Sequence, residues 1–415
     1  MTAPVLAMDF GTSNSAVAIL VDGKVQRLPV EAGADSLPTA VFLPADGGPM
    51  RIGHAAQTAL TDGEEGRYMR ALKSVLGTSL FHEERMIAGR RRSIAGIVTA
   101  LLSQVKAQAE QTAGTRFDRV LSGRPVHFHS ADSQRDARAE ADLRACYQAA
   151  GFQDVGFLPE PEAAALATGG TAQQAETRLI VDIGGGTSDF SVVRIGANGM
   201  EIIASHGIRL GGTDFDQAIS MSHAMPLLGL GGELRRTFGE GLLPVPRALY
   251  ADLATWAMIP FLYTRDTEKT VADLVRHAVN PAPLLRLADV IERRLGHDIA
   301  FAVEKGKIAA NSNQPGACID LGILEPGLSS KITSGMMNAA LTSAREKLRA
   351  ALYETFLHAR IPPSEIESVI LVGGSSLMSL VSDEALAVCP AARIVRADAF
   401  TAVVDGLALA TKSMG

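Results

Sequence analysis

The sequence predicts an α/β protein with two related lobes, on the evidence of its length and of one motif that occurs twice. Its 415 residues exceed what a single hydrophobic core usually serves, so two compact lobes are expected. In residues 179–193, two runs rich in β-branched side chains flank Gly184-Gly185-Gly186. Such runs favour strands, and glycine accepts the backbone conformations of a tight turn, so this stretch is predicted to be a hairpin with a bare loop.

The same plan appears near the N-terminus, in residues 5–20. There an apolar run ends in Asp9, Gly11-Thr12-Ser13 follows, and a second apolar run begins. We align the repeats as Asp9 with Asp182, Thr12-Ser13 with Thr187-Ser188, and Asn14 with Asp189. Two such hairpins, far apart in the sequence, are what a two-lobed protein needs to grip one ligand from both sides.

The residue types in these hairpins indicate a site for a metal-bound polyphosphate. Glycines let several backbone N–H groups converge on an anion, and Thr187 adds a hydroxyl donor. Asp182 and Asp189 bracket the loop with carboxylates, the groups that bind a hard cation. The alternative is an ordinary tight hairpin whose glycines serve only turn geometry, and the paired acids and the repeat weigh against it.

Composition excludes several other classes of protein. The chain is 47% hydrophobic and 20% charged, as in an ordinary globular protein, and its net charge of −6 argues against nucleic-acid partners. Three widely separated cysteines fit a reducing cytoplasm without a zinc site. We see no signal peptide and no apolar run of about 18 residues, so no membrane partner is expected. The basic run Arg90-Arg91-Arg92 is interpreted as a solvated turn before a helix.

Periodicity places further elements along the chain. Helices are expected over residues 97–111, from about residue 133, and over 299–310, with a mainly helical insertion over 217–294. A buried strand at 368–372 runs into a Gly-Gly-Ser turn. Glu160 ends a short strand, at the edge where α/β proteins place ligands, although a solvated loop carboxylate is the commoner case. Lys73, by pattern alone, is an unremarkable surface lysine.

Six motifs together resemble a known family. They are Asp-Phe-Gly-Thr-Ser-Asn at 9–14, Ala-Leu-Lys at 71–73, Pro-Glu-Pro-Glu-Ala-Ala-Ala-Leu at 159–166, Asp-Ile-Gly-Gly-Gly-Thr-Ser-Asp at 182–189, Leu-Gly-Gly-Thr-Asp-Phe-Asp at 210–216 and Val-Gly-Gly-Ser-Ser at 372–376. In this order they resemble the ATPase domain of the heat-shock protein 70 (DnaK-type) chaperones, over nearly the whole chain. The chain looks most like the short YegD-like members, which lack a substrate-binding domain.

The resemblance implies an α/β, two-lobed actin-like ATPase fold with duplicated ribonuclease H-like cores and inserted subdomains. Residues 1–36 and 115–175 would form the core of lobe I, with 37–114 inserted. Residues 176–215 and 300–395 would form the core of lobe II, with a helical subdomain at 216–299 inserted. A C-terminal helix in 396–415 would return to lobe I.

The resemblance also assigns roles to single positions. Gly11, Thr12 and Ser13 would cradle phosphates from one lobe, and Gly184, Gly185, Gly186 and Thr187 from the other. Asp9 and Asp182 would hold Mg²⁺, largely through water. The implied catalytic residues are Lys73, whose ammonium would point at the γ-phosphoryl group, together with Thr187, Glu160 and Asp189. Either Glu160 or Asp189 would position and deprotonate the attacking water, and the sequence does not choose between them.

The nucleoside positions contain departures from the family pattern. Gly211 and Gly212 would approach the phosphates or ribose, Glu304 and Lys307 would bind the ribose, and Gly373, Gly374 and Ser375 the adenosine. The arginine that flanks adenine in the family is Ile308 here, and the serine that faces the base is Asn311. Leu377 and Phe400 also replace polar family residues. An apolar Ile308 covers a base without a cation–π contact, so lower ATP affinity or looser base choice is expected.

The implied function is an ATP-binding, chaperone-like protein with slow Mg²⁺-dependent ATP hydrolysis. Nucleotide-driven lobe closure would signal to a protein partner or co-chaperone, through the proline switch that Arg124 and Pro125 match, without a peptide-binding domain on this chain. The expected ligands are ATP, ADP and Mg²⁺, and the expected location is the cytoplasm. Three alternatives remain: an actin-like polymerising cytoskeletal protein, a small-molecule kinase of the same superfamily, and a scaffold that binds ATP without turnover.

Overall fold

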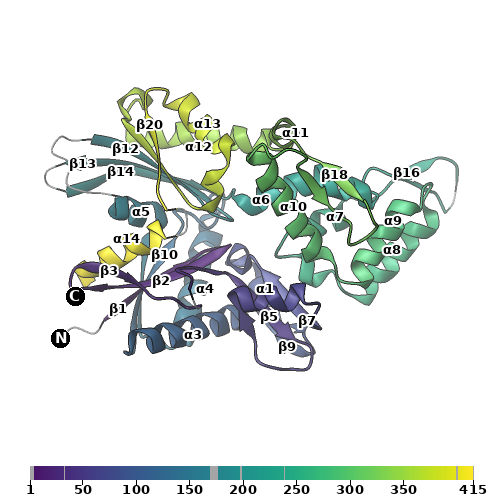
Figure 1. The fold of residues 1–415 in the computed structure, drawn as a ribbon, viewed down its shortest axis with the longest axis horizontal. Helices are drawn as coiled ribbons and strands as arrows, with labels where there is room; N and C mark the ends of the chain where they lie inside the picture. Colours follow the sequence, from purple (N-terminus) through teal and green to yellow (C-terminus); the bar gives the residue numbers. More distant parts are fainter. Residues whose placement is uncertain are drawn as a thin grey trace. The chain divides into compact units, whose positions relative to one another are not determined.

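The computed structural model describes residues 4–31, 33–168, 176–196, 199–237, 239–398 and 401–414, so the expectation placed on Phe400 lies outside the described residues. The chain forms two compact units. The first is Met1–Gly212 together with Glu346–Gly415, and the second is Thr213–Arg345. The first unit contains both large sheets (Figure 1).

The first sheet has the strand order β11-β10-β1-β2-β3, with β4 paired to β2. Strands β1, β2 and β3 form an antiparallel meander, and β10 and β11 extend it in parallel from β1. Five of the six residues of β1 are buried, and the exception is Asp9. This burial is why the sequence of β1 is apolar apart from Asp9. The strands are β1 (Val5–Phe10), β2 (Asn14–Val21), β3 (Lys24–Arg27), β4 (Leu37–Pro38), β10 (Arg119–Arg124) and β11 (Asp154–Pro159).

The second sheet repeats the first. Its order is β14-β13-β12-β19-β20, again an antiparallel meander extended by two parallel strands. The duplication that the repeated hairpins predict is therefore confirmed in the topology of the sheets. The strands are β12 (Glu176–Ile183), β13 (Ser188–Gly196), β14 (Gly199–Ile208), β19 (Ser368–Val372) and β20 (Arg393–Arg396).

The strand register corrects our alignment of the two hairpins. Asp182 pairs with Asp189 across the second hairpin, whereas Asp9 pairs with Ala16 across the first. The two connections have the same length, so Ala16 and not Asn14 occupies the position equivalent to Asp189. The sequence alignment matched polar residues to each other, but the ladder of backbone hydrogen bonds fixes which residues correspond. Only the second hairpin therefore carries a carboxylate on both strands.

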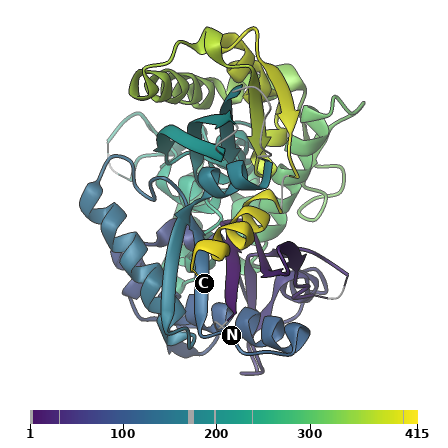
Figure 2. The same ribbon diagram turned by 90° about the vertical axis from the view of Figure 1, so that its left-hand side faces the viewer.

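Two helices pack between the sheets of the first unit, as Figures 1 and 2 show from two directions. Helix α5 (Glu160–Thr168) follows β11, and α14 (Ala402–Ala410) follows β20. They pack against each other, and α14 also contacts β1, β2 and β10. One apolar cluster joins both helices to both sheets, including Ala164, Leu407 and Ile370.

The other elements of the first unit follow the apolar periodicity of the sequence. The helix predicted over 97–111 is α3. It begins after Ser93, whose side chain accepts a hydrogen bond from the N–H of Gly96, and it buries one apolar face. The helix expected from Ser133 is α4. It ends at Ala149, and Ala150 lies half-buried just beyond it.

The run Arg90-Arg91-Arg92 is not a turn as expected but a short strand, β9, paired with β8 in a hairpin whose turn is at Ala88-Gly89. The remaining elements before the second sheet are β5 (Ala40–Pro44), β6 (Arg51–Ile52), α1 (Gly53–Thr61), β7 (Gly66–Arg70), η1 (Leu72–Val75), α2 (Ser79–His82), β8 (Arg85–Ile87), β9 (Arg90–Arg92), α3 (Ile94–Ala113) and α4 (Ser133–Ala149). Those after residue 341 are α12 (Thr342–Ala359), which crosses the boundary between the units, η5 (Pro363–Glu365), η6 (Gly374–Leu377), α13 (Ser379–Val388) and η7 (Thr411–Met414).

The second unit is mainly helical and includes residues 217–294, where a mainly helical insertion is expected. Its core surrounds Trp256, whose indole N–H donates to the buried carboxylate of Asp216. Its elements are α6 (Gly212–Ile219), η2 (Ser220–Ala224), η3 (Met225–Leu228), β15 (Glu233–Arg235), β16 (Leu242–Pro244), α7 (Ala248–Leu253), η4 (Ile259–Phe261), α8 (Arg265–His277), α9 (Ala282–Glu292), α10 (Gly296–Asn311), β17 (Cys318–Asp320), β18 (Ser329–Lys331) and α11 (Ser334–Ala340).

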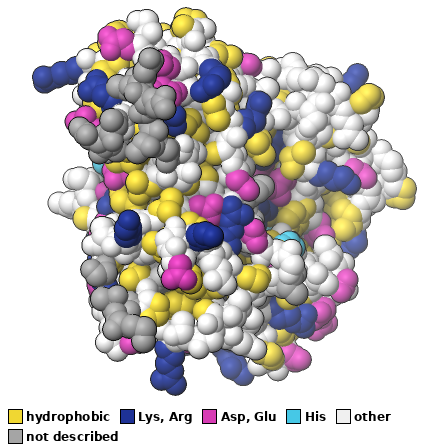
Figure 3. All heavy atoms as spheres, turned by 60° about the vertical axis from the view of Figure 1, so that its left-hand side comes forward, with side chains coloured by type: hydrophobic (Ala, Val, Ile, Leu, Met, Phe, Trp, Pro, Cys, Tyr) yellow, Lys and Arg dark blue, Asp and Glu magenta, His cyan; other side chains and the backbone are white. Residues whose placement is uncertain are grey.

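The surface carries mixed charge. On the face drawn in Figure 3, basic and acidic side chains alternate with apolar and neutral ones. Among the described residues, no helix combines the length and the apolar character that crossing a bilayer requires.

Candidate functional site

The two glycine-containing loops lie against each other. A Cβ added to Gly185 would stand 2.3 Å from the Ser13 hydroxyl oxygen, and one added to Gly186 would stand 3.1 Å from the Thr12 hydroxyl oxygen. The missing side chains therefore allow the close approach of the second loop to the first. The structure thus brings together two loops that are distant in the sequence.

A pocket opens where these loops meet, and we call it the front pocket. It contains about 650 Å³ of open space, part of which is continuous with solvent. It is lined by Asp9, Gly11, Thr12, Ser13, Asn14, Lys73, Glu160, Asp182, Gly184, Gly185, Thr187, Gly373, Gly374, Ser375 and Val403. Most residues that the sequence assigned to phosphate and metal binding thus face one cavity.

The segment before α6 supports the second loop from behind. The N–H of Gly212 donates to the carbonyl of Gly184 at 3.0 Å, and the hydroxyl of Ser188 donates to the carbonyl of Leu210 at 2.7 Å. A Cβ on Gly211 would stand 2.5 Å from the Gly185 carbonyl carbon. Gly211 and Gly212, expected to approach phosphate or ribose, are absent from the lining of the front pocket and pack behind its loop.

Lys73 is buried, in contrast to the surface position that its local pattern suggests. It lies in η1, which begins after Ala71, a residue in the left-handed conformation at φ 60°. Its ammonium contacts Glu160 Oε1 at 2.7 Å, and the two side chains are 7% and 11% exposed. Glu160 comes from the first turn of α5, directly after β11. A buried lysine needs such a partner, so the pair holds a cation inside the pocket.

Asp9 and Asp182 face the front pocket from the C-terminal ends of the equivalent strands β1 and β12. Burial, reinforced by the negative charge of Glu160, raises the pKa of Asp9 to about 7. Burial and the charges of Glu160, Asp189 and Asp9 raise the pKa of Asp182 well above its usual value. Gly373, at φ 81°, permits the approach of the β19 turn, because a Cβ there would stand 2.6 Å from an Asp182 carboxylate oxygen.

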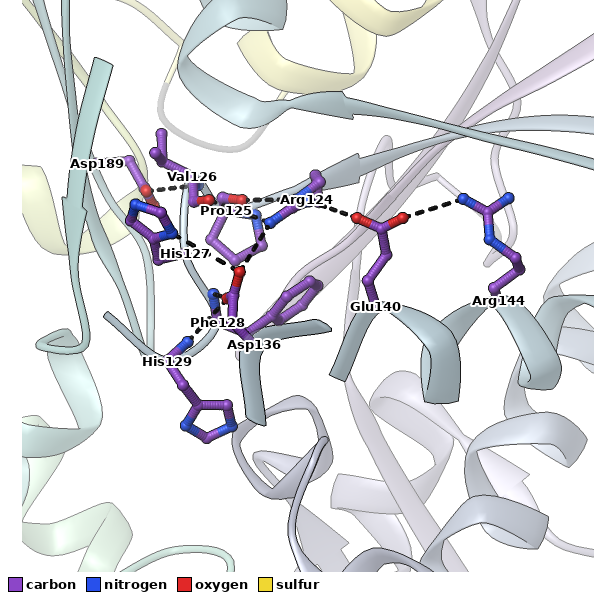
Figure 4. Close-up of polar contacts among 10 residues, drawn as sticks. All are labelled: Arg124, Pro125, Val126, His127, Phe128, His129, Asp136, Glu140, Arg144 and Asp189. Carbon is purple, nitrogen blue, oxygen red and sulfur yellow. Dashed lines mark hydrogen bonds and ion pairs between the residues drawn. The ribbon is translucent and has the colours of Figure 1, made fainter. Parts of the chain in front are cut away.

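Asp189 is held behind the loop and does not line the front pocket. Its Oδ1 accepts the N–H of Val126 at 2.7 Å (Figure 4). Burial raises the pKa of Asp189 to about 8, with a further contribution from the charge of Glu160, while hydrogen bonds from Val126 and Thr187 partly offset this rise. Of the two candidate bases, Glu160 is the one that faces the cavity.

Arg124 organises the loop that contacts Asp189. Its guanidinium donates to the carbonyls of Pro125 and Val126 at 3.0 and 3.1 Å, and it also binds Glu140 on α4. Asp136 accepts the N–H groups of Phe128 and His129 from the other end of the loop. Figure 4 shows the resulting chain of contacts from Asp189 to α4.

The donors present fit a water-coordinated hard cation. Within the described part of the chain, no three or more His, Cys, Asp or Glu side chains gather in a geometry that would cage a metal. Asp9 and Asp182 are carboxylates whose ionised form burial disfavours, and a nearby divalent charge would compensate for that. Mg²⁺ commonly takes one or two carboxylates and keeps several waters, so the two acids at this pocket would suffice to hold it.

Four of the residues assigned to the nucleoside, Glu304, Lys307, Ile308 and Asn311, lie on α10, in the second unit. The Lys307 ammonium contacts Asp216 Oδ1 at 2.7 Å, so this lysine already has a buried partner inside its own unit. Ile308 is 57% exposed, and Glu304 and Asn311 are half-buried. A role for these four residues in nucleoside binding stays a prediction.

Sequence reasoning missed two contributors to the site. Val403, on α14, lines the front pocket, and Val126 supplies the backbone donor to Asp189. Both are apolar residues, although Val126 directly follows the Arg124-Pro125 pair. A backbone N–H leaves no trace in the residue type, so no sequence signal could have indicated Val126.

Comparisons with known proteins identify the family. A family model described as "Hsp70 protein" matches residues 5–226, which is more than half of the chain. The chain is 25% identical over 382 residues to the "Chaperone protein DnaK" of Thermosipho melanesiensis, covering 91% of this chain and 54% of that protein. It is 26% identical over 380 residues to the protein of the same name from Thermosipho africanus, covering 91% and 53%.

The chain therefore spans about half the length of the curated relatives that it matches. The matched residues include both glycine loops, Lys73, Glu160 and the segment behind the second loop. The α/β architecture with two sheets of the same strand order is the actin-like ATPase fold expected from the sequence. Fold, loop geometry and family model agree that the chain belongs to the Hsp70 protein family.

Proposed function

We propose that this chain binds ATP with Mg²⁺ and hydrolyses it slowly, as a chaperone-like member of its family. The observation that carries this proposal is the contact between two glycine loops around a pocket that also contains a buried Lys–Glu pair. Such loops present backbone N–H groups and hydroxyls to phosphate oxygens from two sides.

Each side of the pocket has a distinct task in this proposal. Thr12, Ser13, Thr187 and the loop backbones hold the phosphates, while Asp9 and Asp182 hold Mg²⁺ through water molecules. The bound cation would neutralise charge on the phosphate oxygens. Gly373, Gly374 and Ser375 belong to the third turn of the pocket, which would take the adenosine side of the ligand.

Lys73 and Glu160 carry the chemistry of hydrolysis in this proposal. The Lys73 ammonium stabilises the charge that spreads over the γ-phosphoryl oxygens, because phosphoryl transfer depends mainly on electrostatics and alignment. Glu160 fixes the position of Lys73 and orients the attacking water. Asp189 acts from behind the loop, where it holds Thr187 and Val126, so we assign it a positioning role.

We further propose that the chain resembles the short YegD-like members, works in the cytoplasm and signals to a protein partner through closure of its two lobes. The lobes would be the subdomain pairs that the family resemblance implies. The loop at 125–129 supports this, because it connects Asp189 in the second sheet to α4 beside the first.

Lys73→Ala provides the central test, with Lys24→Ala as a matched control at an exposed lysine on β3. Purified variants are assayed for ATP binding by calorimetry and for hydrolysis by phosphate release, both with Mg²⁺. We expect Lys73→Ala to lower turnover at least a hundredfold while ATP affinity changes less than about fivefold. Thr187→Ala should lower both turnover and ATP affinity.

Unchanged turnover in Lys73→Ala would contradict the mechanism. Tight ATP binding without turnover in the wild type would instead identify a nucleotide-dependent scaffold. ATP-dependent pelleting on sedimentation would identify a filament-forming protein, and ADP release stimulated by a metabolite would identify a small-molecule kinase.

A further inference from the structure

A second cavity shares part of its lining with the front pocket, and we call it the rear pocket. It contains about 290 Å³ of open space and is lined by Thr12, Lys73, Ser74, Pro125, Phe128, His129, Gly186, Thr187 and Arg209.

Three side chains line both pockets, namely Thr12, Lys73 and Thr187. They form a wall of two hydroxyls and one ammonium, all of which donate hydrogen bonds to phosphate oxygens. An anion that passes from one pocket to the other therefore stays within reach of hydrogen-bond donors.

The two pockets differ in charge. The front pocket includes the carboxyl groups of Asp9, Glu160 and Asp182 besides Lys73. Among the described residues that line the rear pocket, none is Asp or Glu, and the charged side chains are Lys73 and Arg209. Because Lys73 is already ion-paired with Glu160, Coulomb attraction for an anion in the rear pocket comes mainly from Arg209, once the anion is separated from the cation that accompanies it in the front pocket.

Arg209 stands at the outer end of the rear pocket. It follows β14 directly, its side chain is exposed, and its guanidinium donates to the carbonyl of Ser74 at 2.9 Å. His129 is buried, and its Nε2 contacts the carbonyl of Leu76 at 2.8 Å. These two contacts tie the rear pocket's walls to the segment that carries Lys73. One Arg209 hydrogen bond to a carbonyl leaves further guanidinium donors for an anion.

We propose that the rear pocket binds inorganic phosphate, with Arg209 as its principal charged ligand. The identity of the anion rests on the proposed function, because phosphate is the product of ATP hydrolysis. The rear pocket would hold the released phosphate after it leaves the front pocket and before it reaches solvent. Arg209 takes no part in binding the nucleotide.

The test titrates inorganic phosphate into the full chain, with and without saturating ADP and Mg²⁺, and measures binding by calorimetry. Arg209→Ala is compared with Arg209→Lys and with Arg194→Ala, which removes another exposed arginine from the same sheet. We expect Arg209→Ala to weaken phosphate binding about tenfold, which is the scale of one hydrogen bond to a charged group. Arg209→Lys should lose less phosphate affinity than Arg209→Ala does, and Arg194→Ala should bind phosphate as tightly as the wild type.

ADP affinity and thermal stability should be equal in all four proteins, which shows that the loss is local. Phosphate binding that is insensitive to Arg209→Ala but lost in Lys73→Ala would place the anion in the front pocket and overturn the proposal. Absence of phosphate binding at millimolar concentrations would overturn it as well.

The nucleotide-free titration separates this proposal from the proposed function. Arg209-dependent phosphate binding in a protein that does not hydrolyse ATP would support an anion site while it contradicts the ATPase assignment. ATP hydrolysis by a protein whose phosphate binding does not depend on Arg209 would support the ATPase assignment and contradict the rear-pocket anion site.

Discussion

At the scale of single residues, the carboxyl groups around the front pocket are destabilising when no cation is bound. Asp9, Asp182 and Asp189 are buried or nearly so, and burial raises the pKa of each, to about 7 for Asp9 and about 8 for Asp189. A raised pKa in the folded state means that folding favours the protonated acid. If the proposed function holds, the protein retains these groups for binding in spite of their cost to stability.

This argument predicts a pH dependence of stability. Asp189 binds a proton in the folded state at pH values where the unfolded chain has already released it, so its contribution favours folding at low pH and is lost as the pH rises toward about 8. We expect the nucleotide-free wild type to lose up to about 1.4 kcal/mol of unfolding free energy per pH unit, relative to Asp189→Asn, between pH 5 and 7.

Urea unfolding of both proteins across this range measures the difference, in buffer without divalent cations. Parallel pH profiles for the two proteins would contradict the burial argument.

Gly185 predicts a second residue-level effect. A Cβ at this position would collide with the Ser13 hydroxyl, which belongs to the opposite loop. Gly185→Ala should force the loops apart and weaken ATP binding about ten- to a hundredfold, the equivalent of 1–3 kcal/mol of overpacking. Gly196→Ala is the control, because an added Cβ meets nothing within 4 Å there. Equal ATP affinity in the two variants, measured by calorimetry, would refute the contact between the loops.

At the scale of elements, the backbones of α5 and α14 approach each other very closely. A Cβ on Gly406 would stand 1.7 Å from the carbonyl oxygen of Ala163, so the helices meet where neither has a side chain of any size. Gly406→Ala should lower the unfolding free energy by about 1–3 kcal/mol. The comparison is Gly96→Ala in α3, where the nearest atom is 3.5 Å away and helix propensity predicts a gain of up to about 1 kcal/mol.

Thermal or chemical unfolding of the two glycine variants distinguishes packing from propensity, since both changes add the same methyl group to a helix. A stabilising effect at both positions would show that α5 and α14 can separate without cost.

The loop after β10 is a second element with a clear dependence on one residue. Arg124 donates hydrogen bonds to two loop carbonyls and to Glu140, so it fixes the position of the Val126 N–H group that donates to Asp189. We expect Arg124→Met to lower ATP turnover about tenfold with little change in ATP affinity, because it loosens a positioning residue and leaves the phosphate loops intact. Arg144→Met is the control, since Arg144 contacts Glu140 but not the loop. Similar turnover in both variants would remove this role.

At the scale of the molecule, the two glycine loops belong to different sheets but to one compact unit. A ligand shared by both loops should protect them together. In hydrogen exchange with ATP and Mg²⁺, we expect slower exchange over residues 11–14 and 184–187 at the same ATP concentration, and no such change with Mg²⁺ alone. Protection of one loop without the other would mean that the ligand does not span them.

The sequence by itself determined the hairpins, the duplication and the types of donor at the site, because strand patterns, glycine turns and acidic strand ends are local properties. Tertiary structure alone decided which of these residues act together. Lys73 has a surface pattern and becomes buried because Glu160, 87 positions away in the chain, folds against it. The correspondence of Ala16 to Asp189, the support of Asp189 by Val126 and the presence of Arg209 at a second pocket likewise depend on backbone register and on contacts between distant segments, which no local pattern of side chains encodes.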